Sequence, residues 1–442
     1  MKKICLFTLI CVSSFVCSAQ THGNKLLTID EMFQLADEKN STLKLSDLSL
    51  QSSDMDVKIA KNERLPKVNV ALSAGYLSDI RITDRNFSNG LTVKMKDFGD
   101  YAHISNNLVV QASQILYAGG AIKNSIANAK LAQSATGYEK RQSRSNIHFM
   151  LLSHYLEIFN FRNQEEVYLK NIEQTEKLVS DIKSKQKEGL ALRNDITRYE
   201  LQLQSLNLAL TQVRNNMSVA NNRLCTLLKL PRETVIEVDK EMLSFLPAAT
   251  NEQEWQATAN DSSPELKIAQ IHSTQADNAE KIINAERLPK IFAFAADQFD
   301  GPITIDMDVK DNNMNIWMVG LGVKYNLSSL YTTNKSVKKQ QIATKAAQEA
   351  ENIAKENLQI EVNAAFTHFL ESFTILQTAE KSVELATVNY NVINNRFLND
   401  LALLTDMLDA SNSKLEAELK MADAKINILF NYFNLKRVAG VL

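Results

Sequence analysis

The pentapeptide Glu63-Arg64-Leu65-Pro66-Lys67 returns unchanged as Glu286-Arg287-Leu288-Pro289-Lys290. Each copy follows a polar segment without glycine or proline, 45–62 or 268–285, and precedes a segment in which apolar and polar residues alternate. The first pattern is typical of a helix and the second of a strand, so both copies are predicted to be helix-to-strand turns. An internal two-fold repeat explains them economically. The turn residues are Arg64, Leu65, Pro66, Arg287, Leu288 and Pro289.

Four strands are predicted from the alternating pattern, two in each half of the chain. They lie at about 67–80, 104–117, 290–299 and 314–326, and the polar segments 81–103 and 300–313 are expected to be exposed hairpin loops. The clearest strand has an apolar face that ends in aromatic residues: Trp317, Val319, Leu321, Val323 and Tyr325. Such a face suits contact with lipid, although a strand of a soluble sandwich would alternate in the same way. Four strands are too few to close a pore, so a barrel would have to be shared by several chains.

Very long helices are expected because the spans 67–230 and 303–442 contain no proline. In the first span, a helix from Ala121 to about Lys187 is predicted, followed by a turn near 188–194. The apolar residues of the next helix recur at alternating intervals of three and four, which is the period of a coiled-coil seam. They are Ile196, Tyr199, Leu203, Leu206, Leu210, Val213, Met217, Ala220, Leu224 and Leu227.

The second span shows the same arrangement. A helix is predicted at about 335–397, then a turn near 398–404 and a helix with a second apolar stripe, interrupted by Ser411. Each half of the chain is therefore predicted to form a long antiparallel helical hairpin. The second stripe consists of Leu404, Leu408, Leu415, Leu419, Ala422, Ile426, Leu429 and Phe433.

Residues 1–19 have the layout of a secretory signal peptide, with two lysines, an apolar run and small residues before Gln20. An alternative makes Cys17 the lipid-bearing first residue of a lipoprotein, although the residues before it are bulkier than such processing usually accepts. Cleavage after Ala19 would leave Cys225 as the one remaining cysteine, so no intramolecular disulfide is expected.

The composition excludes several classes of function. The chain has 49 basic and 51 acidic residues that are interspersed, so nucleic acid is not an expected partner. After the signal there is no run of about 18 apolar residues, which excludes a transmembrane helix. No nucleophile, phosphate-binding or dinucleotide motif occurs, and the histidines lack the spacing of a metal pair. We expect neither an enzyme nor a cofactor or metal site.

Two motifs resemble those of the TolC-like outer-membrane efflux proteins. Tyr117-Ala118-Gly119-Gly120 is similar to the Leu-(Phe/Tyr)-x-Gly-Gly junction that joins strand to helix in this family, with Ile115 where the family often has proline. The segment 405–410, Thr-Asp-Met-Leu-Asp-Ala, resembles the family's Asp-Val-Leu-Asp-Ala segment at a hairpin tip. Gly189-Leu190 and Asn194-Asp195-Ile196 are its counterpart in the first half, and the similarity covers essentially the whole mature chain.

This resemblance implies a mixed α and β membrane protein in the Gram-negative outer membrane, extending into the periplasm. Three identical chains would form one β-barrel of twelve strands, four per chain, continuous with a long α-helical coiled-coil barrel. The domains would be a signal peptide (1–19), a first repeat (20–230), a linker with equatorial elements (231–262) and a second repeat (263–442). Segments 20–62 and 231–285 and the extreme C-terminus would belong, wholly or partly, to a belt of shorter elements around the tunnel.

The resemblance also implies a function, that of a passive exit duct for small molecules or proteins. The partners would be a periplasmic adaptor, an inner-membrane pump driven by protons or ATP, and outer-membrane lipid. An alternative is a periplasmic coiled-coil adaptor or scaffold, but adaptors usually carry one hairpin beside lipoyl-like and barrel modules. A lytic or adhesive surface coiled coil would not need lipid-facing strands. The duplicated hairpin and the aromatic-ended strand favour the duct.

The hairpin tips are the predicted functional site. By analogy, Asp406 and Asp409 narrow a periplasmic gate, together with Asp195, and their combined charge would favour cations. The alternative is that all three are ordinary helix-start acids, with Thr405 as an N-cap. The latch of the closed tip must differ from the family's, because Phe397 and Ala402 occupy the positions of its tyrosine and arginine. Adaptor docking is assigned to Gly189, Leu190, Asn194, Leu401, Leu404 and Thr405.

Overall fold

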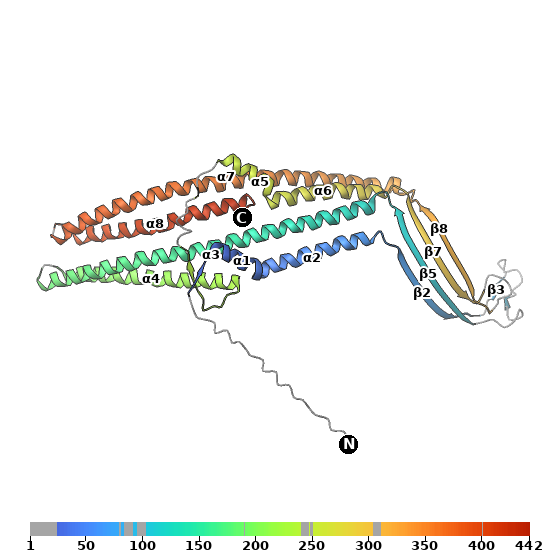
Figure 1. Cartoon of the computed structure of the whole chain (residues 1–442), viewed down its shortest axis with the longest axis horizontal. Helices are drawn as coiled ribbons and strands as arrows, with labels where there is room; N and C mark the ends of the chain where they lie inside the picture. The colour runs from blue at the N-terminus through green and yellow to red at the C-terminus, as the bar shows by residue number, and fades with distance from the viewer. Residues whose placement is uncertain are drawn as a thin grey trace, which may run out of the picture. The chain divides into compact units, whose positions relative to one another are not determined.

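The computed structural model describes residues 24–78, 81–83, 92–94, 103–189, 191–239, 247, 251–303, 311–399 and 401–442. The predicted signal peptide with Cys17, the tip residue Leu190, most of the predicted loop 81–103 and half of the predicted loop 300–313 lie outside these residues. The described part of the chain is mostly helical, with a few strands (Figure 1).

The strands and helices follow one another in an order that is similar in the two halves of the chain. The elements up to residue 228 are β1 (Asn24–Leu27), α1 (Ile29–Lys39), α2 (Ser41–Asn62), β2 (Lys67–Tyr76), β3 (Arg81–Thr83), β4 (Thr92–Lys94), β5 (Ile104–Tyr117), α3 (Ala121–Lys187) and α4 (Arg193–Leu228). The remaining elements are β6 (Val235–Val238), α5 (Glu252–Ser262), α6 (Pro264–Ala285), β7 (Lys290–Gly301), β8 (Met314–Lys324), α7 (Ser329–Leu398) and α8 (Leu404–Val438).

The four predicted strands are confirmed as β2, β5, β7 and β8, which form one antiparallel sheet in the order β2-β5-β7-β8. One face of this sheet is apolar and exposed. On this face, Leu72 of β2 is 76% exposed and Leu321 of β8 is 74% exposed. On the other face, Phe292 and Phe294 pair directly with Gly322 and Gly320. Their rings occupy the space that side chains at the glycines would need, since a Cβ at Gly320 would lie 2.9 Å from the Phe294 ring.

The long helices have the predicted bounds at the hairpin turns. The first runs from Ala121 to Lys187, as expected, and its partner α4 buries or half-buries every residue of the predicted seam. Helix α7 begins at Ser329 rather than near 335. At its first turn, the hydroxyl of Ser329 donates to the carbonyl of Asn326, and the hydroxyl of Thr332 donates to the carbonyl of Ser328. Within each hairpin the two helices run antiparallel (Figure 1).

Every residue of the stripe predicted for α8 is also buried or half-buried, although the most buried residues near the tip lie beside the stripe. Ala422, Ile426 and Leu429 are buried, but Leu408 and Leu415 nearer the tip are only half-buried. The fully buried positions there are Met407, Ala410, Lys414 and Ala417. Helix α8 packs against more than one neighbour, so its buried face is wider than the two-position seam of a simple coiled coil.

The described chain forms two compact units. Unit 1 comprises the described residues of 1–40, 147–249 and 367–434, and unit 2 those of 41–146, 250–366 and 435–442. Helices α3 and α7 contribute to both units, because each begins in unit 2 and ends in unit 1.

Unit 1 contains a small sheet that the alternating pattern did not predict. Strands β1 and β6 pair in parallel. Tyr155 of α3 binds β1 and the residue that follows β6. Its hydroxyl donates to the carbonyl of Leu27 at 2.6 Å and accepts the backbone N–H of Asp239 at 2.8 Å. Four-residue strands are too short to give a recognisable alternation, which explains why they were missed.

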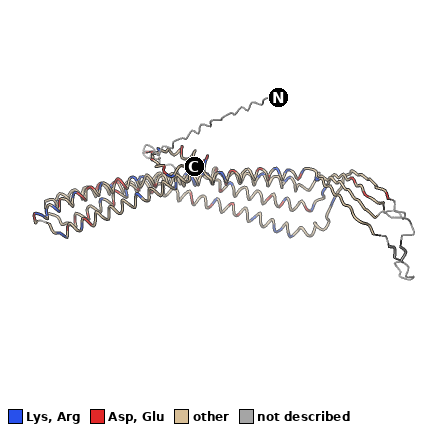
Figure 2. The backbone as a smooth tube through the Cα atoms, turned by 90° about the horizontal axis from the view of Figure 1, so that it is seen from below, with Lys and Arg blue, Asp and Glu red and all other residues tan. Residues whose placement is uncertain are grey.

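Unit 2 contains α2 and α6, two helices of 22 residues each within segments expected to form shorter elements. Helix α2 binds α3 through the ion pair of Asp47 with Lys140, and α6 binds α7 through Thr344, which donates to the Ala276 carbonyl at 3.2 Å. Basic and acidic residues are interspersed along the helices of the described chain, whereas the described strands carry few charges (Figure 2). None of the described helices combines the length and apolar character that a membrane crossing requires.

Candidate functional site

The turn of the first hairpin tip is closed by backbone geometry. After α3 ends at Lys187, the N–H of Gly189 donates to the carbonyl of Gln186 at 3.0 Å, and Gly189 has a φ of +77°. Glycine adopts this left-handed conformation without a steric penalty, and it terminates a helix well for that reason. Asn194 lies exposed in the first turn of α4, and Leu190 lies outside the described residues.

Two of the three predicted gate aspartates cap their own helices. The carboxylate of Asp195 accepts the N–H of Leu192 at 3.0 Å, and that of Asp406 accepts the N–H of Leu403 at 3.1 Å. Each of these two aspartates thus accepts a backbone N–H at the start of a helix, as the alternative interpretation of ordinary helix-start acids predicts. This capping leaves the exposed Asp406 accessible, so the gate role stays a prediction.

Two details of the second tip differ from the helix-start interpretation. Thr405 is not the N-cap, because α8 already begins at Leu404. The residue before the helix, Leu403, takes the capping position, and its backbone bonds to Asp406. Asp409 is exposed and lies beyond the first turn, so it is not a helix-start acid.

The two tips pack on one another through a shared apolar cluster in unit 1. Its buried members come from all four long helices: Leu178, Val179, Ile182, Ile196, Tyr199, Tyr390 and Met407. Beside it lies a cavity of about 420 Å³, which brings together the predicted residues Asp195, Leu404 and Thr405 with the charged Lys185 and Arg198. Leu401, Asp406 and Asp409 do not line this cavity, and Leu401 is exposed.

Lys185 is a functional candidate that sequence reasoning missed. Its ammonium group donates to the backbone carbonyl of Phe397 at 3.5 Å and lies 5.5 Å from the centre of the Phe397 ring. It therefore connects α3 of the first hairpin with α7 of the second. The departure from the family pattern at Phe397 and Ala402 indicated the region, but nothing local to Lys185 distinguishes it from the lysines around it.

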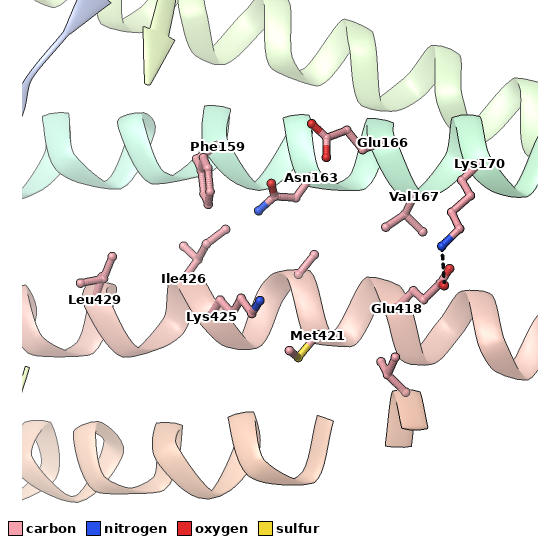
Figure 3. A pocket seen from close by; sticks show the side chains of 12 residues that line it. Phe159, Asn163, Glu166, Val167, Lys170, Glu418, Met421, Lys425, Ile426 and Leu429 are labelled. Carbon is pink, nitrogen blue, oxygen red and sulfur yellow. Dashed lines mark ion pairs between the residues drawn. The ribbon is translucent and has the colours of Figure 1, made fainter. Parts of the chain in front are cut away.

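Next to the apolar tip cluster lies a polar layer formed by Lys414, Glu418 and Gln174. The ammonium group of Lys414, 6% exposed, lies 4.5 Å from the centre of the Tyr390 ring, 3.9 Å from a carboxylate oxygen of Glu418 and 3.4 Å from Gln174. Burial lowers the pKa of Lys414, and Glu418 partly offsets this effect. Lys170 also pairs with Glu418, as Figure 3 shows.

A second cavity, of about 530 Å³, adjoins this polar layer between α3, α7 and α8 (Figure 3). Its walls are mainly apolar, with Phe159 on one side and Ile426 and Leu429 on the other. Glu418 and Lys170 at one end are paired with each other at 3.8 Å. The heptad pattern gave no sign of this cavity, because it arises where the apolar residues of three helices fail to fill the space between them.

The predicted junctions meet in unit 2. Gly119 and Gly120 have φ values of +64° and +87°, which change the chain direction between β5 and α3. A Cβ at Gly119 would lie 2.9 Å from the carbonyl oxygen of Ala285 and 3.0 Å from the side chain of Leu288. Only glycine combines this backbone conformation with so close an approach. The strand-to-helix junction thus packs on the second of the two repeated turns, while Tyr117 is half-exposed at the end of β5.

The two repeated pentapeptides form the same kind of turn. Leu65 donates its N–H to the carbonyl of Asn62 at 2.9 Å, and Leu288 donates to that of Ala285 at 3.1 Å. Pro66 and Pro289 then directly precede β2 and β7, where a residue without an N–H is tolerated. The carbonyl of Arg64 accepts from Gln114 at 3.1 Å, and the Arg287 guanidinium donates to Asn334.

Titratable groups that could support catalysis or metal binding are dispersed. Among the described residues, no three or more His, Cys, Asp or Glu side chains form a group suited to a metal ion. His148, which is buried, contacts Asp37 at 3.0 Å and stacks on Phe33, and His154 contacts Glu157 at 2.9 Å. These contacts are ordinary pairings within the helical packing.

Comparison with known proteins gives a match in structure alone. No model of a protein family matches the chain, and no curated protein matches its sequence. Among solved structures, the outer-membrane channel OprN is 16% identical, with a TM-score of 0.77 over 94% of this chain and 90% of that one. The outer-membrane protein VceC from Vibrio cholerae is 14% identical, with a TM-score of 0.76 over 93% and 96%. The Campylobacter jejuni CmeC outer-membrane channel is 14% identical, with a TM-score of 0.75 over 96% and 90%.

Proposed function

We propose that this chain, which has the fold of TolC-like outer-membrane channels, is the outer-membrane exit duct of a tripartite efflux or secretion system. Three copies would form one barrel and one helical tunnel, reaching from the outer membrane into the periplasm. The duct would be passive, and neither an enzyme nor a pump. An inner-membrane pump would supply small molecules or proteins as cargo, and a periplasmic adaptor would join the two.

The sheet carries this proposal. Strands β2 and β8 each have one neighbour among the described strands, so each leaves a row of backbone N–H and C=O groups unpaired at an edge 10 or 11 residues long. Long open edges beside an exposed apolar face are unfavourable for a single chain in water. Joining the β8 edge of one copy to the β2 edge of the next pairs these groups and places the apolar face toward lipid.

The proposed duplication has support from the order of elements. Helix, strand, strand and two long helices occur as α2, β2, β5, α3 and α4, and then as α6, β7, β8, α7 and α8. We propose that these are the two repeats, 20–230 and 263–442, joined by 231–262. The duplicated hairpin also favours the duct over a periplasmic adaptor or scaffold, which would need one hairpin.

Planar-bilayer recording tests the proposed function directly. The mature chain, purified from membranes in detergent, is expected to have the mass of a trimer and to form discrete conducting channels. Membranes washed with alkaline carbonate should retain it, because barrel strands are integral to the bilayer. An adaptor without a membrane anchor would be released by carbonate and would not conduct, so a released, monomeric chain would exclude the duct.

The gate is the part of this proposal most open to test. Replacing both Asp406 and Asp409 with alanine should enlarge the single-channel conductance and weaken the preference for cations, since each chain loses two carboxylates at the tip. Reversal potentials in a salt gradient measure this preference. The control is Asp423→Ala, on the same helix but distant from the tip. Unchanged selectivity in the double variant would remove these aspartates from the gate.

A further inference from the structure

The cavity between α3, α7 and α8 has the size and the walls of a binding site for a small molecule. Its volume of about 530 Å³ lies within the range of ligand pockets, which are mainly apolar and contain a few convergent polar groups. Its apolar walls include Phe159 of α3, Val383 of α7 and Ile426 of α8. All of the lining residues belong to unit 1, so a single chain supplies the site.

Glu418, at one end of the cavity, is a carboxylate shared among several donors. One of its oxygens lies 3.8 Å from the ammonium group of Lys170 and 3.9 Å from that of Lys414. Its other oxygen accepts the side-chain N–H of Asn171 at 3.1 Å. One negative charge therefore already faces two positive charges, and it cannot balance a third.

A third lysine, Lys425, lines the same cavity, and within the described chain no hydrogen bond or ion pair engages its ammonium group. The remaining charged residue of the walls, Glu166, points away from the cavity (Figure 3). Asp423, two residues before Lys425, accepts from Asn160 and Gln164 and does not line the cavity. The cavity therefore has a surplus of positive charge.

The side-chain amide of Asn163 is a second polar group that no other described residue binds. It extends from α3 toward α8, between the apolar side chains of Phe159 and Val167 (Figure 3). The amide N–H and the Lys425 ammonium group are both hydrogen-bond donors. Two donors and an unbalanced positive charge in an apolar cavity suit an oxygen anion that is attached to an apolar body.

We propose that this cavity binds an anionic amphiphile, a small molecule with an apolar body and one carboxylate. The body would lie against Phe159, Ile426 and Leu429, where contact removes apolar surface from water. The carboxylate would accept from Lys425 and Asn163. Fatty acids released from lipid and soluble aromatic acids share this chemistry. The site does not require the proposed duct, because its walls come from one chain.

Two probes with the same apolar body separate the role of the charge from that of the walls. Phenylbutanoate carries a carboxylate at neutral pH, and phenylbutanol is its neutral counterpart. Calorimetric titration of the purified full chain in a non-ionic detergent measures both affinities, and titration into detergent alone is the blank. We expect both probes to bind, and we expect changes at the polar groups to affect only the carboxylate.

Variants at the two donors test the carboxylate contact. Lys425→Met keeps the aliphatic stem and should weaken phenylbutanoate about two- to fivefold, the modest effect of an exposed charge, with phenylbutanol unchanged. Asn163→Asp keeps the size of the side chain and should weaken phenylbutanoate at least as much, because like charges repel. The control is Lys420→Met, on the same helix but outside the cavity, which should change neither affinity. Equal phenylbutanoate affinities in the two methionine variants would overturn the proposal.

A variant that fills the cavity tests the location. Ala422→Leu enlarges a side chain of the wall and should weaken both probes at least about tenfold, while circular dichroism confirms that the helices remain. Unchanged binding in a folded Ala422→Leu chain would place the probes elsewhere and overturn the proposal. If this variant does not fold, the Lys425 and Asn163 variants still decide. Neither measurement needs a conducting channel, so a chain that binds phenylbutanoate without conducting would count against the duct alone.

Mass spectrometry of organic extracts distinguishes the two sources of the ligand. A fatty acid present in the chain purified from membranes, and absent from Ala422→Leu purified in the same way, would identify lipid as the source. A wild-type chain that carries no fatty acid but binds phenylbutanoate would support a soluble acid. A wild-type chain that neither carries a fatty acid nor binds phenylbutanoate would overturn the proposal.

Discussion

At the scale of single residues, two tyrosines in unit 1 show how differently a buried hydroxyl can act. Tyr155 is fully buried, and its hydroxyl both donates and accepts a hydrogen bond, which ties α3 to β1 and to the residue after β6. Tyr199 is 1% exposed, yet its hydroxyl has no hydrogen-bond partner among the described residues. A buried hydroxyl without a partner loses its hydration and gains nothing in return.

Replacing Tyr199 with phenylalanine should therefore stabilise the tip cluster by about 1 kcal/mol, because it removes an unsatisfied polar atom without leaving a cavity. The matched control is Tyr155→Phe, which should destabilise the protein by about 1–3 kcal/mol, since it removes both of that residue's hydrogen bonds. Melting temperatures in one detergent at one heating rate measure both effects. A lower melting temperature for Tyr199→Phe would mean that the hydroxyl has a partner, such as water.

The same tyrosine makes stability depend on alkaline pH. Burial raises the pKa of Tyr199 above its ordinary value of 10.0, so the protonated phenol contributes stability that is fully present below pH 10.0 and is lost as the pH rises toward the folded-state value. The wild type should thus lose more melting temperature between pH 8 and 11 than Tyr199→Phe does. Tyr155 and Tyr390 also have raised pKa values, so only the difference between wild type and variant reports on Tyr199.

At the scale of elements, the sequence is most informative where a pattern is long and local. The bounds of α3 and the positions of all four strands of the large sheet agree with the predictions, because proline-free length, alternation and paired glycines act through the backbone nearby. The seam of α4 is likewise buried as its heptad spacing predicts. The burial of Lys414 was not predictable, because its side chain contacts Gln174 of α3 and Tyr390 of α7 as well as Glu418 of its own helix.

The candidate site was predictable in position but not in its contacts. The turns that place Gly189 and Asp195 at the tip follow from local sequence, and the capping bond of Asp195 is of the kind that a helix-start acid forms. The Lys185 contact with Phe397 joins residues that are far apart in sequence, and no periodicity encodes it. The pairing of β1 with β6 was missed for the same reason. Contacts between distant segments depend on the whole packing, which one sequence does not reveal.

At the scale of the whole molecule, the exposed apolar residues on the long helices matter most. In unit 1, Leu385, Val388 and Val392 of α7 are spaced by three and four residues and are each more than half exposed. Helix α4 carries a similar row with Leu201 and Leu208, which are 63% and 61% exposed. Exposed apolar rows with helical spacing are typical of surfaces that pack on another helix. We expect the partner to be a second copy of this chain, because a ring of identical subunits joins two different faces of each copy.

Placing a charge in either row should therefore prevent assembly. Val388→Glu on α7 and Leu201→Glu on α4 should each convert the proposed trimer into monomers, because a carboxylate buried between helices without a partner costs several kcal/mol. Ser413→Glu, on an exposed polar part of α8, adds the same charge and should leave the trimer intact. Light scattering of the detergent-solubilised proteins measures the mass, and circular dichroism confirms that the helices remain. Loss of the trimer in only one of the two row variants would contradict a ring in which α4 and α7 supply opposite faces.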